Sequence, residues 1–155
     1  MKLNSRDLAY IAGIVDGEGC ISLNLCHIYH GKRIKEGTRI TIALSVYNTY
    51  FPLLKYLKAA FGGTLYNAEN PKGFSSKKAL YQWRVAEQRA CEILKLLLPH
   101  LKVKKKQAIL ALRLAARKRR NKGRRLTAFE IKTRLKIVSD CHKLNQKGGL
   151  PLRTS

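Results

Sequence analysis

The apolar residues of this 155-residue chain change their spacing at a glycine-rich turn, and this change constrains the fold more than any other feature of the sequence. From Leu8 to Val15 they recur at the spacing of one face of an α-helix. After Gly19 they alternate with polar residues, which is typical of a β-strand with one buried face. We therefore predict a helix over residues 6–16, capped by Ser5, that leads directly into a strand.

The same change of spacing occurs a second time further along the chain. Two alternating segments on either side of the polar stretch 30–38 predict a long hairpin. The helix that follows has Asn48 or Thr49 as its predicted cap and ends at Gly62. The remaining predicted elements are strands over 64–68 and 79–85, helices over 87–98, 101–117 and 127–144, the last opening with a Thr127, Glu130 capping box, and a basic connection over 117–125.

This order of elements indicates the fold class. Hairpins give antiparallel strand pairs, and the intervening helices can gather on one face of the resulting sheet. We predict an α+β fold: an αββαββα core with a saddle-like antiparallel sheet on one face and extra C-terminal helices. The expected domain organisation is a single domain over residues 1–147, with a flexible tail over 148–155.

The charge of the chain indicates its partner. There are 32 Lys and Arg residues against 9 Asp and Glu, which gives a formal net charge of +23 and favours a polyanion such as nucleic acid. A basic membrane-surface protein concentrates its charge on one amphipathic helix, whereas here it is spread from Lys2 to Arg153. No apolar segment is long enough to cross a bilayer, and Asp7 comes too early for a signal peptide. We expect an intracellular protein of the cytoplasm, nucleoid or an organelle, with no membrane partner.

The cysteines do not indicate a metal site. Cys20, Cys26, Cys91 and Cys141 form no C-x-x-C pair and lie too far apart for a zinc finger. Cys26, His27 and His30 lie close in sequence, but an alternating strand directs such side chains to both of its faces. We therefore expect free thiols in a reducing compartment.

One face of the predicted sheet carries polar side chains suited to the edges of DNA bases. The alternation directs Ala79, Tyr81, Trp83 and Val85 to the core and the residues between them to the opposite face. A solvated polar face occurs in many antiparallel sheets, but the charge of the chain favours DNA binding here. The predicted DNA-binding residues are Ser22, Asn24, Arg39, Thr41, Ser45, Tyr66, Gln82 and Arg84.

The first predicted helix combines small residues with two acids at its end. Ala12, Gly13 and Gly17 leave little side-chain bulk along the helix, so that two such helices could approach closely. Asp16 and Glu18 concentrate negative charge in a chain that must bind a polyanion. A hard divalent cation such as Mg²⁺ resolves that conflict, because it takes carboxylate and phosphate oxygens together.

The segment from Leu8 to Gly19 reads LAYIAGIVDGEG, and its last nine residues resemble the LAGLIDADG signature. Gly17 replaces the alanine that precedes the final acid of the signature, and Glu18 replaces the final aspartate. The predicted order of elements over residues 5–110 is similar to that of the LAGLIDADG family as well. The resemblance therefore covers most of the chain.

The resemblance implies roles for individual residues. Two chains would place their first helices at a twofold axis, with Ala12, Gly13 and Asp16 in the interface and Asp16 bonded near the helix ends. Glu18 would be the metal-binding catalytic acid, with Gly17 adding its backbone carbonyl to the shell of Mg²⁺ or Mn²⁺. Asn48 and Lys104, with Lys106 as an alternate to Lys104, would position water and stabilise charge during in-line attack on the phosphorus.

The function implied by the resemblance is that of a site-specific homing endonuclease. Such a homodimer would make metal-dependent double-strand breaks at a long pseudo-palindromic DNA site, and the chain would be encoded within an intron. The alternatives are an RNA maturase that binds intron RNA and assists splicing, and a non-cutting DNA-binding protein of the same fold. A ribosomal-type RNA-binding protein would explain the charge but not the motif.

Overall fold

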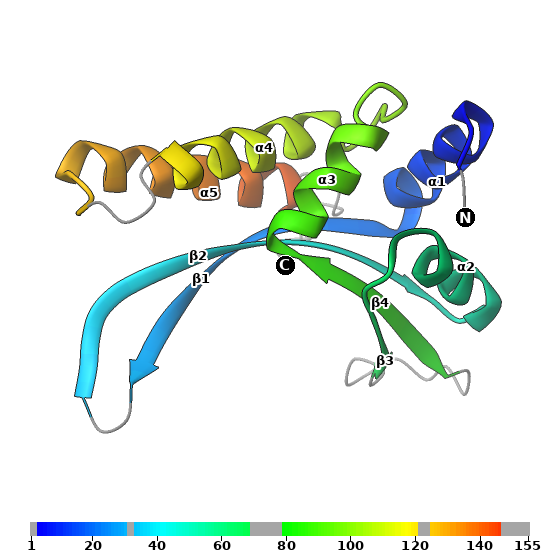
Figure 1. Cartoon of the computed structure of the whole chain (residues 1–155), viewed down its shortest axis with the longest axis horizontal. Helices are drawn as coiled ribbons and strands as arrows, with labels where there is room; N and C mark the ends of the chain where they lie inside the picture. The colour runs from blue at the N-terminus through cyan, green and yellow to red at the C-terminus, as the bar shows by residue number, and fades with distance from the viewer. Residues whose placement is uncertain (1–2, 31–32, 69–78, 121–124, 147–155) are drawn as a thin grey trace, which may run out of the picture.

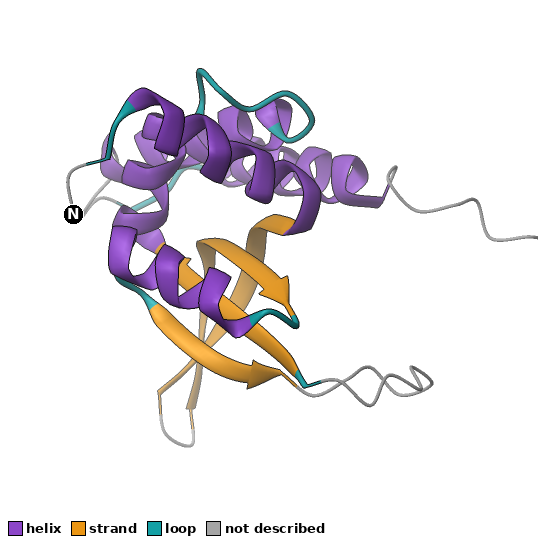
Figure 2. Ribbon diagram, turned by 90° about the vertical axis from the view of Figure 1, so that its right-hand side faces the viewer, coloured by secondary structure: helices purple, strands orange, loops and turns teal. Residues whose placement is uncertain are grey.

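The computed structural model describes residues 3–30, 33–68, 79–120 and 125–146, with the backbone alone for those from 26 to 38. Two layers make up the fold, because helices cover one face of a four-stranded antiparallel sheet of order β1-β2-β4-β3 (Figure 1, Figure 2). The predicted α+β class and αββαββα core are confirmed. The elements are α1 (Ser5–Glu18), β1 (Gly19–His30), β2 (Arg33–Asn48), α2 (Phe51–Phe61), β3 (Thr64–Ala68), β4 (Leu80–Ala86), α3 (Glu87–Leu97), α4 (Lys105–Arg120) and α5 (Ala128–Gln146).

Helix α1 is longer than the sequence predicts, and its cap is Asn4 rather than Ser5. The Asn4 side chain accepts hydrogen bonds from the backbone N–H groups of Arg6 and Asp7, and the Asp7 carboxylate accepts one from the Asn4 N–H. At the other end the chain passes directly into β1. A Cβ at Gly19 would lie 2.6 Å from the Val15 carbonyl oxygen, so only glycine fits this junction.

The hairpin of β1 and β2 corrects the predicted loop over residues 30–38. Pairing runs from Gly19 with Val46 to His30 with Arg33, with an irregularity between His27 and Tyr29. Figure 1 shows that this end of the hairpin extends away from the helical layer. Strands that extend past the core bury neither face, so they need no alternation of apolar and polar residues. The polar sequence of this segment therefore suggested a loop, although its backbone forms strands.

The C-terminal helices also begin and end at residues other than those predicted. Helix α4 begins at Lys105 instead of Leu101 and continues to Arg120, so the expected basic connection over 117–125 begins as the last turn of this helix. At the start of α5 the Glu130 N–H donates to the Thr127 hydroxyl at 3.2 Å, as in the predicted capping box. The Glu130 carboxylate instead accepts hydrogen bonds from Arg117 and Arg134.

The core lies between the sheet and the helices. Trp83 and Val85 are buried as predicted, whereas Tyr81 is only half-buried and Ala79 is exposed, because Tyr81 lies at the start of β4 and Ala79 precedes the strand. The Trp83 Nε1–H donates to the carbonyl oxygen of Gly62 at 2.8 Å, which joins β4 to the end of α2. None of the described helices is long and apolar enough to cross a membrane.

Helix α5 covers the free edge of the sheet along β1. The Asn145 side chain donates to the Ile21 carbonyl oxygen at 3.1 Å, and the His142 Nε2 lies 2.8 Å from the Leu23 carbonyl oxygen. These contacts satisfy backbone groups that an edge strand would otherwise present to another chain. Cys20, Cys91 and Cys141 are free thiols, as expected.

Candidate active site and nucleic-acid interface

Glu18 lies at the exposed C-terminal end of α1, beside the end of β2. The Asn48 Nδ2 group donates a short hydrogen bond to the Glu18 carboxylate. The Asn48 oxygen accepts a hydrogen bond of 2.7 Å from the Tyr50 N–H, and α2 is capped by the Tyr50 backbone rather than by a side chain of Asn48 or Thr49. Asn48 is therefore held at both ends of its amide and orients the Glu18 carboxylate.

Asp16 fixes Lys104 at the same end of α1. Its carboxylate accepts hydrogen bonds from the backbone N–H groups of Lys102 at 2.7 Å and Lys104 at 2.8 Å, and the Lys104 ammonium donates to the Asp16 carbonyl oxygen at 2.5 Å. These bonds hold the segment before α4, which is why that helix begins later than predicted. The structure thus brings Glu18, Asn48 and Lys104 together, although 86 residues separate Glu18 from Lys104.

Asp16 is consequently an intramolecular link, as expected from its predicted bonds near the helix ends, and its place in a dimer interface stays a prediction. Partial burial raises the pKa of the Asp16 carboxyl, but the N–H groups of residues 102–104 and the Lys104 charge outweigh burial and hold this pKa below its ordinary value of 3.8. A carboxylate bonded in this way serves the fold of its own chain.

Asp16→Ala should lower the free energy of unfolding by about 1–2 kcal/mol at pH 7, the usual effect of losing a capping side chain. Because the folded-state pKa is lowered, the stabilisation is complete above the pKa of the unfolded chain and is lost as the pH falls through the folded value. Urea denaturation of both proteins between pH 7 and pH 3 measures this. The difference in the free energy of unfolding between the wild type and Asp16→Ala should shrink as the pH falls. Asp140→Ala, which removes a carboxylate from α5 instead, is the control. A constant difference across this range would contradict the role of the charged carboxylate.

The described side chains can supply only part of the ligand shell of a divalent cation. No three of their Asp, Glu, His or Cys side chains gather into a metal cage. Glu18 is nevertheless an exposed carboxylate, with oxygens of the kind that Mg²⁺ prefers. The remaining ligands would have to come from phosphate, water or a second chain, and the backbone carbonyl of exposed Gly17 lies next to Glu18 in sequence.

The exposed face of α1 is formed by glycines. Gly13 and Gly17 are exposed, and a Cβ at either position would meet nothing within 4 Å. Together with Leu53 of α2 they line a shallow hollow of about 410 Å³. Ala12 is wholly buried in the core of its own chain, so its expected place in a dimer interface is wrong.

Six of the eight predicted DNA-binding residues lie on the open face of the sheet with accessible surface: Ser22, Asn24, Thr41, Tyr66, Gln82 and Arg84. Arg39 is also exposed, and its guanidinium lies 3.9 Å from the Glu87 carboxylate. Ser45 lies between Cys20 and Arg84 in the register and is only 6% exposed. Its neighbours cover Ser45, so its predicted contact with a base is corrected.

Tyr47 is a surface residue that the sequence reasoning missed. Its ring is 41% exposed and its hydroxyl accepts a hydrogen bond of 2.7 Å from the Gln82 side chain. The signal was present, because the alternation through Arg39, Thr41 and Ser45 reaches Tyr47 two residues later. Tyr47 therefore belongs to the open face.

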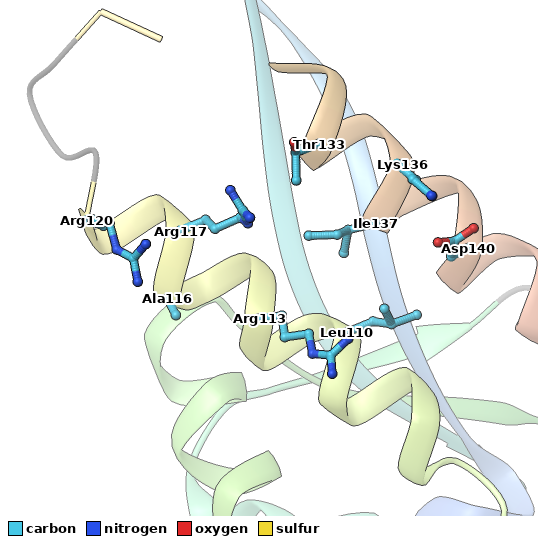
Figure 3. Close-up of a pocket in the computed structure, with 9 residues that line it drawn as sticks. All are labelled: Leu110, Arg113, Ala116, Arg117, Arg120, Thr133, Lys136, Ile137 and Asp140. Atoms are coloured by element: carbon cyan, nitrogen blue, oxygen red, sulfur yellow. The ribbon is translucent and has the colours of Figure 1, made fainter. Parts of the chain in front are cut away.

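Part of the basic charge near the end of α4 is paired within the chain. Arg117 forms an ion pair with Glu130 at 2.7 Å, and Lys118 forms one with Glu87 at 2.6 Å. These two cations stabilise the helical layer and should not be counted among those presented to DNA. Other cations line an open groove between α4 and α5 (Figure 3), with a volume of about 610 Å³ and with Arg113, Arg120 and Lys136 among its residues.

No protein-family model matches the sequence, and no curated protein matches it either. Similarity appears among solved structures. The archaeal intron-encoded homing endonuclease I-Vdi141I, solved in complex with DNA, has a TM-score of 0.72 and 19% identity over 93% of this chain and 87% of its own. The homing endonuclease I-CvuI, solved on a DNA target in the presence of 2 mM Mg, has a TM-score of 0.69 and 20% identity over 90% of this chain and 82% of its own.

A third structure matches over slightly less than half of its own length. The LAGLIDADG homing endonuclease I-SmaMI, bound to cleaved DNA, has a TM-score of 0.66 and 15% identity, covering 90% of this chain but only 46% of its own. At such identities the comparison concerns the fold alone, here the α+β arrangement of helices on a four-stranded antiparallel sheet. The chain has the fold of the LAGLIDADG homing endonucleases.

Proposed function

We propose that this chain is a LAGLIDADG homing endonuclease that makes metal-dependent double-strand breaks at a specific DNA site. The observation that carries the proposal is the cluster at the end of α1. There Asn48 bonds to exposed Glu18, and Asp16 fixes Lys104 beside them. The fold is shared with endonucleases whose structures contain DNA, which supports the same substrate here.

The active form is a homodimer acting at a long pseudo-palindromic site. One chain carries a single motif helix, and the exposed Gly13 and Gly17 let two backbones approach closely. The match to less than half of I-SmaMI supports this assembly, because two copies of the present chain are needed to equal that length. A gene of this kind is proposed to lie within an intron, and the protein to act inside the cell.

The residues of the cluster divide the work of hydrolysis. Glu18 would hold the cation, Mg²⁺ or Mn²⁺, and Asn48 keeps the Glu18 carboxylate oriented. The cation supplies Lewis-acid stabilisation of the charge that develops on the phosphate. Lys104 adds a fixed positive charge, since its ammonium has three donors and the Asp16 carbonyl oxygen takes one. In-line attack of water on the phosphorus would break the opposite P–O ester bond, with one proton lost from the water and one gained by the leaving sugar oxygen, and with no covalent enzyme intermediate.

A library of DNA duplexes with a randomised centre tests the proposal. The protein is incubated with the library and Mg²⁺, or with Mg²⁺ and excess chelator, and the cut ends are sequenced. We expect paired cuts on the two strands of related sequences, flanking a pseudo-twofold centre, and no cuts in chelator. Binding of enriched sequences without cutting would instead support a non-cutting DNA-binding protein.

Binding should weaken steeply with salt, because Lys and Arg side chains displace counterions from phosphates. A plot of log affinity against log salt should have a slope of about −0.9 for each phosphate neutralised. Arg113→Ala and Lys136→Ala should leave the slope for duplex DNA unchanged, since their groove lies in the helical layer on the other side of the sheet. A flat plot for the wild type, or a slope reduced by the groove variants, would contradict this placement.

The α4–α5 groove is the observation that favours a second function, an RNA maturase. Its cations lie apart from the open sheet face, so RNA could bind there without displacing DNA (Figure 3). Competition distinguishes the two functions. Intron RNA bound in this groove should not compete with duplex DNA, and the Arg113→Ala variant should bind this RNA more weakly. RNA bound on the open face of the sheet should compete with DNA instead.

A further inference from the structure

A row of three polar side chains crosses the open face of the sheet. Gln82 of β4 pairs in register with Tyr47 of β2 on one side and with Tyr66 of β3 on the other. Side chains paired across neighbouring strands lie on the same face and within reach of one another. The two tyrosines are 41% and 48% exposed, so large aromatic surfaces flank the glutamine amide.

The hydrogen bond of Gln82 makes this row asymmetric. Its Nε2 group donates to the Tyr47 hydroxyl at 2.7 Å, and no such bond joins Gln82 to Tyr66 in the described part of the chain. A glutamine amide carries two N–H donors and one acceptor oxygen. With one donor engaged by Tyr47, the other N–H and the Oε1 atom remain for a ligand, and the bond holds the amide in place on the open face.

We propose that Tyr47 and Gln82 together form an adenine-reading unit. The inference rests on the proposed DNA-binding function and assigns one base of the target. Adenine presents an N7 acceptor and an N6 donor side by side in the major groove, and a glutamine amide matches this pair with its N–H and its oxygen. Guanine presents two acceptors there, so it leaves the Gln82 oxygen without a donor. Tyr47 is the positioning residue, because its hydrogen bond restrains the position and plane of the Gln82 amide.

The neighbouring cation extends the assignment to a second base. Arg84 lies on the same face of β4, two residues after Gln82, and is exposed. Residues two apart on a strand are separated by about 6.8 Å, and the rise of B-DNA is about 3.4 Å per base pair, so the two side chains span two base-pair steps when β4 lies along the duplex axis. Arginine reads guanine through its O6 and N7 atoms. Each half of the target should hold an adenine and a guanine separated by one base pair.

Binding selection with four proteins tests this assignment. Wild type, Tyr47→Phe, Gln82→Glu and the matched control Tyr66→Phe are each incubated with randomised duplexes in Ca²⁺, and the bound fraction is sequenced. Wild type should favour adenine at one position of each half-site by about 5- to 150-fold, the range for one bidentate contact. Tyr47→Phe should reduce that preference to less than about threefold, because the amide is no longer oriented. Gln82→Glu should shift it to cytosine, whose N4 group donates to a carboxylate.

The control separates this role from a general effect on the sheet. Tyr66→Phe removes a hydroxyl from the same row but has no bond to Gln82, so its preference at the adenine position should equal that of the wild type. An enriched site whose base preferences are the same in all four proteins would overturn the inference alone. A wild-type selection that enriches no sequence would overturn the proposed function with it.

Discussion

Glu18→Gln should abolish cleavage of both DNA strands while leaving specific binding intact. The amide preserves the shape of the side chain and can still accept the hydrogen bond from Asn48. It is, however, a far poorer ligand for a hard cation than a carboxylate. Loss of a group that only orients a metal ligand costs about 10- to 100-fold in activity or affinity, so loss of the ligand itself should cost more than about 100-fold.

The measurement is the rate of paired strand cutting in Mg²⁺ at a site selected by the wild-type protein, together with the affinity of each protein for that site. Removing one negative charge per chain should leave affinity equal or slightly tighter, because Glu18 repels phosphates when no cation is bound. Glu92→Gln is the matched control, since it neutralises an exposed carboxylate on α3 that bonds only to Gln88 in the described structure. Metal-dependent cutting by Glu18→Gln at the wild-type rate would remove Glu18 from the active site.

Gly13→Leu should separate the dimer without unfolding the chain. A Cβ at Gly13 meets nothing within 4 Å, so a single chain has room for the new side chain. Replacing glycine inside an exposed helix turn should even stabilise the monomer, by up to about 1 kcal/mol. Between two closely packed helices the same side chain causes overpacking of about 1–3 kcal/mol, which corresponds to about a 5- to 150-fold weaker dimer.

Sedimentation measures the dissociation constant of the dimer, and thermal unfolding checks that the chain remains folded. The rate of double-strand cutting should fall as the dimeric fraction falls, because each chain carries a single Glu18. Ser139→Leu, at an exposed position on α5, adds the same side chain away from α1 and should leave assembly unchanged. A monomeric wild type on DNA, or a Gly13→Leu protein that dimerises and cuts as well as the wild type, would refute the proposed arrangement.

Local patterns determined the elements and their faces. The spacing from Leu8 to Val15 and the alternation after Gly19 predicted α1 and β1, since the periodicities of helix and strand are properties of the chain itself. The same alternation identified Gln82 and Arg84 as residues of the open face, and the net charge of +23 indicated a polyanionic partner. The elements and faces depend only on neighbouring residues, which explains why the structure confirms them, whereas the partner stays a proposal.

Errors arose where a local pattern permits two outcomes. Small size made Ala12 and Gly13 equally suitable for close helix packing, but they lie about 100° apart around the helix. The core buries Ala12 and leaves Gly13 exposed, and only the position of the sheet decides which of them can face a second chain. Ser45 follows the alternation correctly, yet the side chains from neighbouring strands bury it.

The sequence by itself determined which residues have the chemistry for the site: a carboxylate at Glu18, an amide at Asn48 and an ammonium at Lys104. Only the tertiary structure decided which of these groups are in contact. Asn48 bonds to Glu18 because β2 ends beside α1, and hydrogen bonds to Asp16, 88 residues away in the chain, hold Lys104. The hydrogen bond between Gln82 and Tyr47, 35 residues apart, depends in the same way on strand register. Periodicity reports the direction of each side chain from its own backbone, whereas contacts between distant segments depend on how the whole core packs.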